Sequence, residues 1–334
     1  MEIETLGIDL GKRTFHLVGM DKRGRIVLKK KLSRSQLLPF IGNLKSCMIG
    51  MEACSGAHYW GRQFIKHGHE AKLISPQFVK PYVKGNKNDF NDSEAICEAV
   101  SRPTMRFVTI KSIEQRNIQN VPSIRERLVH NRTAISNQIR GILHEYGHVI
   151  AQGITNIRKE IPTLISEEDI ELIALAKRLL QELYEEFCGL DCKIKALEKQ
   201  LQQISQESEV CQRLEKLKGV GPMTSTALVA AVGNPREFKN GRHLAAWLGL
   251  VPRQHSTGGK AKLLGISKRG NCYLRRLLIH GARSAMRYAQ SHTQWLKELI
   301  ERRGKYKAYV AYANKNARLM WAIMIKGNEY QYEA

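Results

Sequence analysis

The sequence predicts an α/β domain at the amino end of the chain and an α-helical remainder. Residues 5–10, 14–20 and 25–28 read as three short strands separated by turns. Helix and strand patterns then alternate up to a helix that begins near Asn91, and from Lys111 onward the pattern is mostly helical. Three meandering strands followed by alternating helices and strands match the element order of a ribonuclease-H-like fold.

The elements after the meander each have a local signal. Ser33 can cap a helix that runs through Leu44. The apolar run Ser46–Glu52 reads as a buried strand that ends in a carboxylate. A helix over His58–Lys66 and a strand over Glu70–Ile74 follow, and the last helix opens with Asn88-Asp89-Phe90-Asn91-Asp92.

Four carboxylates occupy related positions in this order of elements. Asp9 lies in the otherwise apolar first strand and Glu52 ends the fourth strand, while Asp89 and Asp92 are spaced i,i+3 at a helix start. Singly, each has another explanation, such as a helix cap or a strand-end turn. Together they could not all stay ionised without cations, and oxygen ligands of this kind suit Mg²⁺. Two such ions about 4 Å apart can stabilise both oxygens of a phosphoryl displacement.

The charge of the chain predicts a polyanionic partner. The net charge is +23, and residues 213–334 carry 23 Lys and Arg against 6 Asp and Glu. Residues 151–212, in contrast, carry 7 against 12. Excess cations bind phosphates through counterion release, which favours nucleic acid. An anionic membrane fits less well, because the cations do not border a Trp/Phe amphipathic face.

Cysteine usage and hydropathy predict a cytoplasmic protein without a membrane partner. The seven cysteines are an odd set with no CxxC pair, which argues for a reducing compartment. No apolar run approaches the roughly 20 residues of a membrane span, and the start does not resemble a signal peptide.

Two motifs favour other functions, and further features argue against both. Residues 7–14, GIDLGKRT, look like the phosphate-binding hairpin of the sugar-kinase and actin ATPases, but no second Asp-Gly hairpin or glycine-rich adenosine loop follows. Residues 144–148, HEYGH, fit the HExxH zinc-protease pattern. Gly147 would weaken the helix that must align the two histidines. We therefore expect a helix end at this motif and no catalytic zinc.

The acidic middle of the chain has a long apolar repeat. Apolar residues alternate by three and four from Ile173 to Ile204, which predicts a coiled coil. We expect this arm to drive self-association, and packing against other helices of the same chain is the alternative.

A glycine-rich turn and a basic loop follow the arm. Residues 217–222, LKGVGP, join two helical runs in a helix-hairpin-helix pattern, in which Gly219 and Gly221 allow a tight turn and the next helix can hold a phosphate. A plain glycine–proline turn is the alternative. Ser256 lies in the cationic loop PRQHSTGGK, where the residues alone suggest a phosphate contact or a turn. The cations expected to contact nucleic acid are Arg253, Lys260, Lys262, Lys268, Arg269, Arg275 and Arg276.

Several of these segments together resemble a known family. GIDLGKRTFHLVGMD, GMEACSGAHYW, PQFVKPYVKGNKNDFNDSEAI, GVGPMTSTAL and LAAWLGLVPRQHSTGGKAKLLGISKRGNCYLRRLLIHGARS are similar to the DEDD transposases of bacterial insertion-sequence family one-ten. The resemblance covers about residues 5–325. It places the family's acidic tetrad on Asp9, Glu52, Asp89 and Asp92, and its serine nucleophile on Ser256. Phe90 departs from the small or polar residue expected there.

The resemblance implies an activity and partners that composition alone does not. It implies a recombinase that excises and integrates its element by Mg²⁺-dependent strand exchange through circular DNA. It further implies a guide RNA encoded by the element and a homodimer, or a tetramer, in which acids and serine meet across protomers. We expect Arg253, Lys260 and Lys262 to neutralise the phosphate that Ser256 attacks.

The predicted domains are a ribonuclease-H-like (RuvC-like) DEDD domain at 1–110, a helical linker at 111–165, a coiled-coil arm at 166–212 and a basic helical domain with the serine loop at 213–330. Two other functions stay open from the residues. One is a Holliday-junction-type nuclease that uses only the four acids, and the other is a non-catalytic nucleic-acid scaffold.

Overall fold

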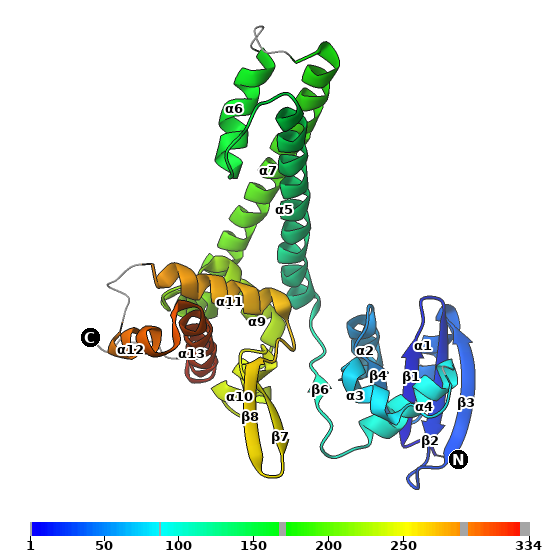
Figure 1. Cartoon of the computed structure of the whole chain (residues 1–334). Helices are drawn as coiled ribbons and strands as arrows, with labels where there is room; N and C mark the ends of the chain where they lie inside the picture. The colour runs from blue at the N-terminus through cyan, green and yellow to red at the C-terminus, as the bar shows by residue number, and fades with distance from the viewer. Residues whose placement is uncertain (1, 87, 167–171, 288–292, 328–334) are drawn as a thin grey trace. The chain divides into compact units, whose positions relative to one another are not determined.

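The computed structural model describes residues 2–86, 88–166, 172–287 and 293–327. The chain divides into two compact units, Met1–Glu114 and Gln115–Ala334 (Figure 1). The predicted α/β domain lies in the first unit, and the predicted arm and basic domain lie in the second. The predicted end of the last domain at residue 330, and residues 167–171 of the predicted arm, lie outside the described residues.

The amino-terminal unit is built on a six-stranded mixed sheet with strand order β3-β2-β1-β4-β5-β6. The first three strands form an antiparallel meander, and β1, β4 and β5 are parallel neighbours. This order is the ribonuclease-H-like arrangement that the sequence predicts. The strands are β1 (Thr5–Leu10), β2 (Thr14–Met20), β3 (Ile26–Ser33), β4 (Met48–Glu52), β5 (Glu70–Ile74) and β6 (Phe107–Val108).

Helices cover both faces of this sheet. On one face, α1 (Arg34–Gly42) and α2 (Ala57–Lys66) pack on apolar residues such as Leu6, Ile8 and Leu17. On the other face, α4 (Asp89–Val100), with α3 (Pro76–Val79) and the short helix η1 (Lys80–Tyr82), packs on residues that include Val18 and Ile74. Because side chains alternate along a strand, each residue's face follows from its parity.

The third strand is longer than the predicted 25–28. It continues through Lys29, Lys30 and Lys31, which pair with residues of β2. These lysines are exposed on an edge strand, where charged side chains oppose pairing with another chain. A run of lysines does not alternate with apolar residues, so the pattern concealed the second half of the strand.

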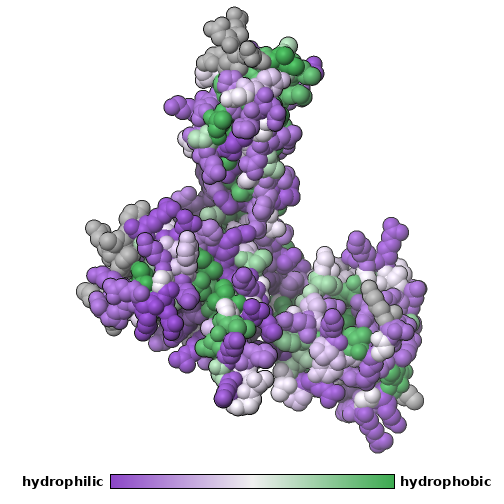
Figure 2. Space-filling view, viewed as in Figure 1, coloured by the Kyte–Doolittle hydropathy of each residue, from purple (hydrophilic) through white to green (hydrophobic). Residues whose placement is uncertain are grey.

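Three helices form an arm in the second unit (Figure 1). They are α5 (Ile113–Glu145), α6 (Ile154–Ser166) and α7 (Ala174–Gln206). Arg125 and Arg132 of α5 pair with Glu198 and Asp191 of α7, so these two helices run antiparallel. Figure 2 shows largely hydrophilic sides on this arm and hydrophobic surface at its end, where α7 begins.

The apolar repeat of α7 packs inside the chain. Leu180, Phe187, Leu190 and Ile194 are buried together with residues of α5 and α6. The stripe therefore packs against the chain's own helices, and self-association through the arm stays a prediction. A substitution such as Leu190→Lys would disrupt this core, so it does not test self-association.

Helices and one β-hairpin form the rest of the second unit. The helices α10, α11 and α13 share a core with α8 and α9. Within the described part of the chain, every helix is too short or too polar to span a bilayer. The elements are α8 (Glu209–Glu215), α9 (Pro222–Val232), η2 (Pro235–Glu237), α10 (Gly241–Trp247), β7 (Pro252–Thr257), β8 (Lys260–Ile266), α11 (Cys272–Ala285), α12 (Gln294–Arg303) and α13 (Lys305–Lys326).

The glycine-rich turn between α8 and α9 has a packing role. Gly219 has φ +84°, and a Cβ there would lie 2.4 Å from the carbonyl oxygen of Gly281 in α11. Only glycine tolerates both the left-handed backbone and this approach. Gly221 caps α9 with extended backbone. Packing thus accounts for Gly219 without a phosphate, and the predicted phosphate contact stays a prediction.

Candidate active site

The four predicted acids lie around one face of the amino-terminal sheet. Asp9 has the same parity as Gly7, and Glu52 has the same parity as Gly50, so both side chains leave the sheet on the side that α4 covers. Asp89 and Asp92 lie in the first turn of α4. The parallel pairing of β1 with β4 puts the ends of these two strands side by side. The sequence prediction of convergence is consistent with this geometry.

Glycine in β1 lets α4 approach the acids closely. A Cβ on Gly7 would lie 2.1 Å from the carbonyl oxygen of Ser93 and 2.7 Å from the amide nitrogen of Cys97. The Ser93 hydroxyl donates to the carbonyl oxygen of His16 at 2.9 Å, which ties α4 to β2. Asn88 caps the helix by accepting a hydrogen bond from the amide of Phe90. These contacts fix the first turn of α4 over the end of β1.

The acids interact electrostatically. Burial, followed by the nearby carboxylates of Asp89 and Asp92, raises the pKa of Asp9, and His16 opposes this rise. Burial, Asp9 and Asp92 raise the pKa of Glu52. Neighbouring carboxylates therefore disfavour ionisation of Asp9 and Glu52, and a bound cation would relieve this repulsion.

A histidine that the sequence analysis missed lies beside two of the acids, Asp9 and Asp89. His16 on β2 pairs with Asp9 across the hairpin, and its Nδ1 lies 3.3 Å from Oδ2 of Asp89. Ligand atoms of Asp9, His16 and Asp89 all lie within 4.8 Å of one another. The hairpin register was the available signal, because it places residue 16 opposite residue 9.

Phe90, the departure from the family pattern, packs against this histidine. The two rings meet edge to face with centroids 4.9 Å apart. The contact restricts the imidazole plane while its Nδ1 faces Asp89. An aromatic residue at position 90 thus has a structural role beside the acids.

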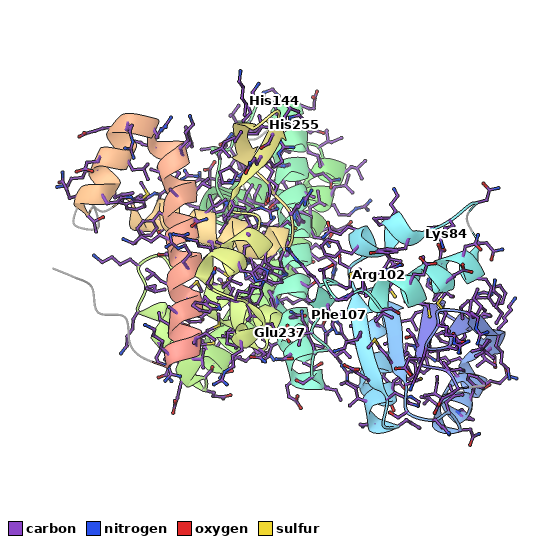
Figure 3. All side chains as sticks on the ribbon, turned by 90° about the horizontal axis from the view of Figure 1, so that it is seen from below. Lys84, Arg102, Phe107, His144, Glu237 and His255 are labelled. Atoms are coloured by element: carbon purple, nitrogen blue, oxygen red, sulfur yellow. The ribbon has the colours of Figure 1, made fainter. Side chains whose placement is uncertain are left out.

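Ser256 lies on the exposed hairpin of the second unit, which Figure 3 marks with His255. All six residues of β7 are exposed. Gln254 Nε2 donates to Ser256 Oγ at 2.7 Å, and Ala261 is the cross-strand partner of the serine. Neither strand of the hairpin carries a carboxylate. A carboxylate base for this hydroxyl must therefore come from outside the hairpin.

The hairpin register places two of the predicted cations relative to Ser256. Lys262 pairs with His255 and Lys260 pairs with Thr257, so both lysines extend from the face opposite Ser256. Their predicted role in neutralising the phosphate that this serine would attack stays a prediction. Arg253 lies at the irregularity between Pro252 and Gln254, where the simple alternation does not apply.

Other predicted cations differ in their roles. Arg275 is part-buried and donates to the carbonyl oxygens of Leu248 and Arg269 at 3.0 and 2.7 Å, so it supports the loop before α11. Arg276 pairs with Glu126 of α5 and stacks on Tyr273. These two arginines have structural partners, whereas Lys268 and Arg269 have exposed side chains.

The HEYGH motif is a helix end, as predicted. α5 ends at Glu145, and Gly147 has φ +78°. His144 therefore lies in the last turn of the helix and His148 lies beyond it, so the two histidines do not share a helical face.

Comparisons with known proteins match two successive parts of the chain. Residues 6–148 match a family described as Transposase, and residues 211–299 match the Transposase IS116/IS110/IS902 family. The chain is 46% identical over 334 residues to the transposase for insertion sequence element IS1111A of Coxiella burnetii, covering 99% of this chain and 92% of the relative. It is 44% identical to a probable family 20 transposase of Pseudomonas aeruginosa, covering 99% of each. It is 39% identical to the transposase for IS1328 of Yersinia enterocolitica, covering 98% of each.

Proposed function

The chain belongs to the IS110/IS116/IS902 family of insertion-sequence transposases, and we propose that it excises and integrates its element by Mg²⁺-dependent cleavage and exchange of DNA strands. One observation carries the proposal. Asp9, Asp89 and His16 present ligand atoms within 4.8 Å, and Glu52 and Asp92 act on the same electrostatic centre.

The residues at this centre fit a divalent metal. Asp9 and Glu52 are half-buried carboxylates whose pKa values are raised by burial and by neighbouring acids, and a cation would stabilise such a donor set. Asp9 and Asp89 would hold the ion, with Glu52 and Asp92 close enough to share its charge. A bound Mg²⁺ would supply Lewis acidity and charge neutralisation at the phosphate. His16 holds Asp89 in position from the side opposite the solvent.

Ser256 is the nucleophile in this proposal. Its Oγ attacks the scissile phosphorus, one ester oxygen leaves with the cut strand, and the serine proton passes to that oxygen. The phosphoserine ester conserves the free energy of the cleaved phosphodiester bond, so the strands can be rejoined without another energy source. Gln254 donates to Oγ and leaves the hydroxyl hydrogen free to transfer. A two-stranded ribbon that is exposed on both faces has a shape that can enter a DNA groove.

The proposed partners follow from the charge of the chain and from the location of the acids and Ser256 on different units. Net charge +23 suits binding to DNA and to a guide RNA from the same element, whose base pairing would supply sequence specificity. The acids belong to the first unit and Ser256 to the second. We propose a homodimer, pairing into a tetramer at synapsis, in which these groups meet at one phosphate.

A trapping experiment tests the mechanism. End-labelled element-end DNA is incubated with protein and Mg²⁺, quenched in detergent, and the adduct is digested for mass spectrometry. We expect a phosphoserine at position 256 that Ser256→Ala abolishes, while DNA binding changes less than about two-fold. Thr257→Val is the matched control, because it removes a neighbouring hydroxyl from the opposite hairpin face.

The same experiment separates the competing functions. Cleavage without an adduct in wild-type protein would favour the junction nuclease that uses the four acids alone. No cleavage under any metal condition, with DNA binding intact, would favour the non-catalytic scaffold.

A further inference from the structure

The second unit contains a groove of about 1500 Å³ at the foot of the hairpin that carries Ser256. Pro252 and the run Leu263–Ile266 form one wall. The start of α10, Trp295 of α12 and one side of α13 from Tyr306 to Ala322 form the others. The groove therefore adjoins the hairpin but is built mainly from rigid helices.

Large apolar and aromatic side chains are exposed to solvent in this groove. Tyr306 is 85% exposed, Leu263 66% and Trp295 39%. Lys315 Nζ lies 5.0 Å from the centre of the Trp295 ring. Exposed aromatic rings that stand beside cations are the elements on which unstacked bases pack in single-strand-binding proteins.

The charge of the groove has one sign. Its described lining includes Arg242, Lys307, Lys315 and Arg318, and none of the described lining residues is Asp or Glu. A ligand that complements this lining is apolar in its body and anionic at its edge. A second copy of the chain, with a net charge of +23, is a poor complement.

We propose that this groove binds an unpaired segment of a nucleic-acid strand. Bases stack on Tyr306 and pack against Trp295 and Leu263, and phosphates lie along Lys307 and Arg318. Binding itself is independent of the serine mechanism. The further conclusion that the bound segment belongs to the strand cut at Ser256 rests on the proposed function and on the shared hairpin.

The test uses the full-length protein and two labelled probes. One is an oligothymidylate of about 20 nucleotides, longer than the 4–16 nucleotides that single-strand folds commonly cover, and the other is a duplex of equal length. We expect Tyr306→Ala to weaken oligothymidylate binding about 5- to 140-fold, the range for loss of one base stack. Duplex affinity should change less than about two-fold. Tyr59→Ala, a change at an exposed tyrosine of the first unit, is the control and should leave both affinities unchanged.

Two further measurements keep the proposal falsifiable if one variant behaves poorly. Oligothymidylate should quench tryptophan fluorescence in wild-type protein, and Trp295→Phe should remove most of that quenching. Lys307→Gln should lower the slope of log affinity against log salt by about 0.7 for the single strand.

Three results would overturn the proposal. Equal losses for single strand and duplex would mean that Tyr306 serves general DNA binding. Unchanged affinity for both probes would exclude an unpaired strand from the groove. If Tyr306→Ala changes the mass measured by sedimentation but not the affinity for either probe, a second copy of the chain is the occupant. Ser256→Ala should keep the single-strand affinity, so failure of the serine mechanism and failure of this site are distinguishable.

Discussion

Replacing Asp9 by Asn should stabilise the metal-free protein while it abolishes DNA cleavage. The pKa of Asp9 is raised by burial and by the carboxylates of Asp89 and Asp92. A carboxyl group whose pKa is higher in the folded state destabilises the fold at any pH above that folded pKa. At neutral pH, and without metal, the Asp9 charge is therefore unfavourable, and Asn removes it at nearly constant volume.

The size of the effect follows from the geometry of the site. Ligand oxygens of Asp9 and Asp89 lie within 4.8 Å, where two unit charges repel by about 1 kcal/mol in water and about 3 kcal/mol at an effective dielectric constant of 20. The Asp89 side chain is 58% exposed, and His16 lies 3.3 Å from it, so the lower value applies. We expect a gain of roughly 1 kcal/mol in the free energy of unfolding, which corresponds to a rise of a few degrees in Tm.

Thermal unfolding followed by circular dichroism in EDTA measures this gain. The matched control is Asp21→Asn, an Asp to Asn change in the same sheet unit. The Asp21 carboxylate accepts hydrogen bonds from the amides of Arg25 and Arg23 at 2.9 Å, and these bonds lower its pKa. The same substitution should therefore lower Tm at position 21. Added Mg²⁺ should raise the Tm of wild-type protein and have little effect on Asp9→Asn.

Whether Asp9→Asn raises or lowers Tm in EDTA decides how the Asp9 carboxylate is interpreted. If Asp9→Asn and Asp21→Asn lose equal stability in EDTA, the Asp9 carboxylate is an ordinary strand-end group that its surroundings stabilise. Full cleavage by Asp9→Asn in Mg²⁺ would contradict the metal role directly, whatever its Tm.

Three other predictions test how the structure is held together. Gly7→Ala should cost about 1–3 kcal/mol and reduce cleavage, because its Cβ would meet backbone atoms of α4, and far-UV melting and activity assays check this. Gly189→Ala, at an open position inside α7, should instead gain about 1 kcal/mol by urea unfolding. Although burial opposes ionisation of Asp191, hydrogen bonds from Arg158, Lys195 and Arg132 lower its pKa to about 2. Asp191→Asn should therefore cost about 2 kcal/mol at pH 7, and the cost should disappear as the pH falls from about 4 towards 2.

Strand periodicity made the fold of the first unit predictable, together with the sheet face on which Asp9 and Glu52 lie. A period of two fixes which face a side chain leaves, and parallel neighbours bring strand ends together, so Asp9 and Glu52 could be placed before any coordinates. His16 was missed although the same rule reaches it, because a histidine in an apolar strand has many structural roles. Its partner Asp89 comes from a helix far along the chain, and strand periodicity says nothing about how that helix docks.

In the second unit, sequence patterns predict which residues are buried or cationic but not what these residues face. The heptad spacing of α7 correctly predicts a buried stripe, but a period cannot identify the partner helix, and here the partners belong to the same chain. Likewise, a cationic loop predicts phosphate binding without assigning faces. Only the hairpin register places Ser256 and Lys262 on opposite sides. The four acids lie on the first unit and the serine on the second, so substitutions can test each unit separately.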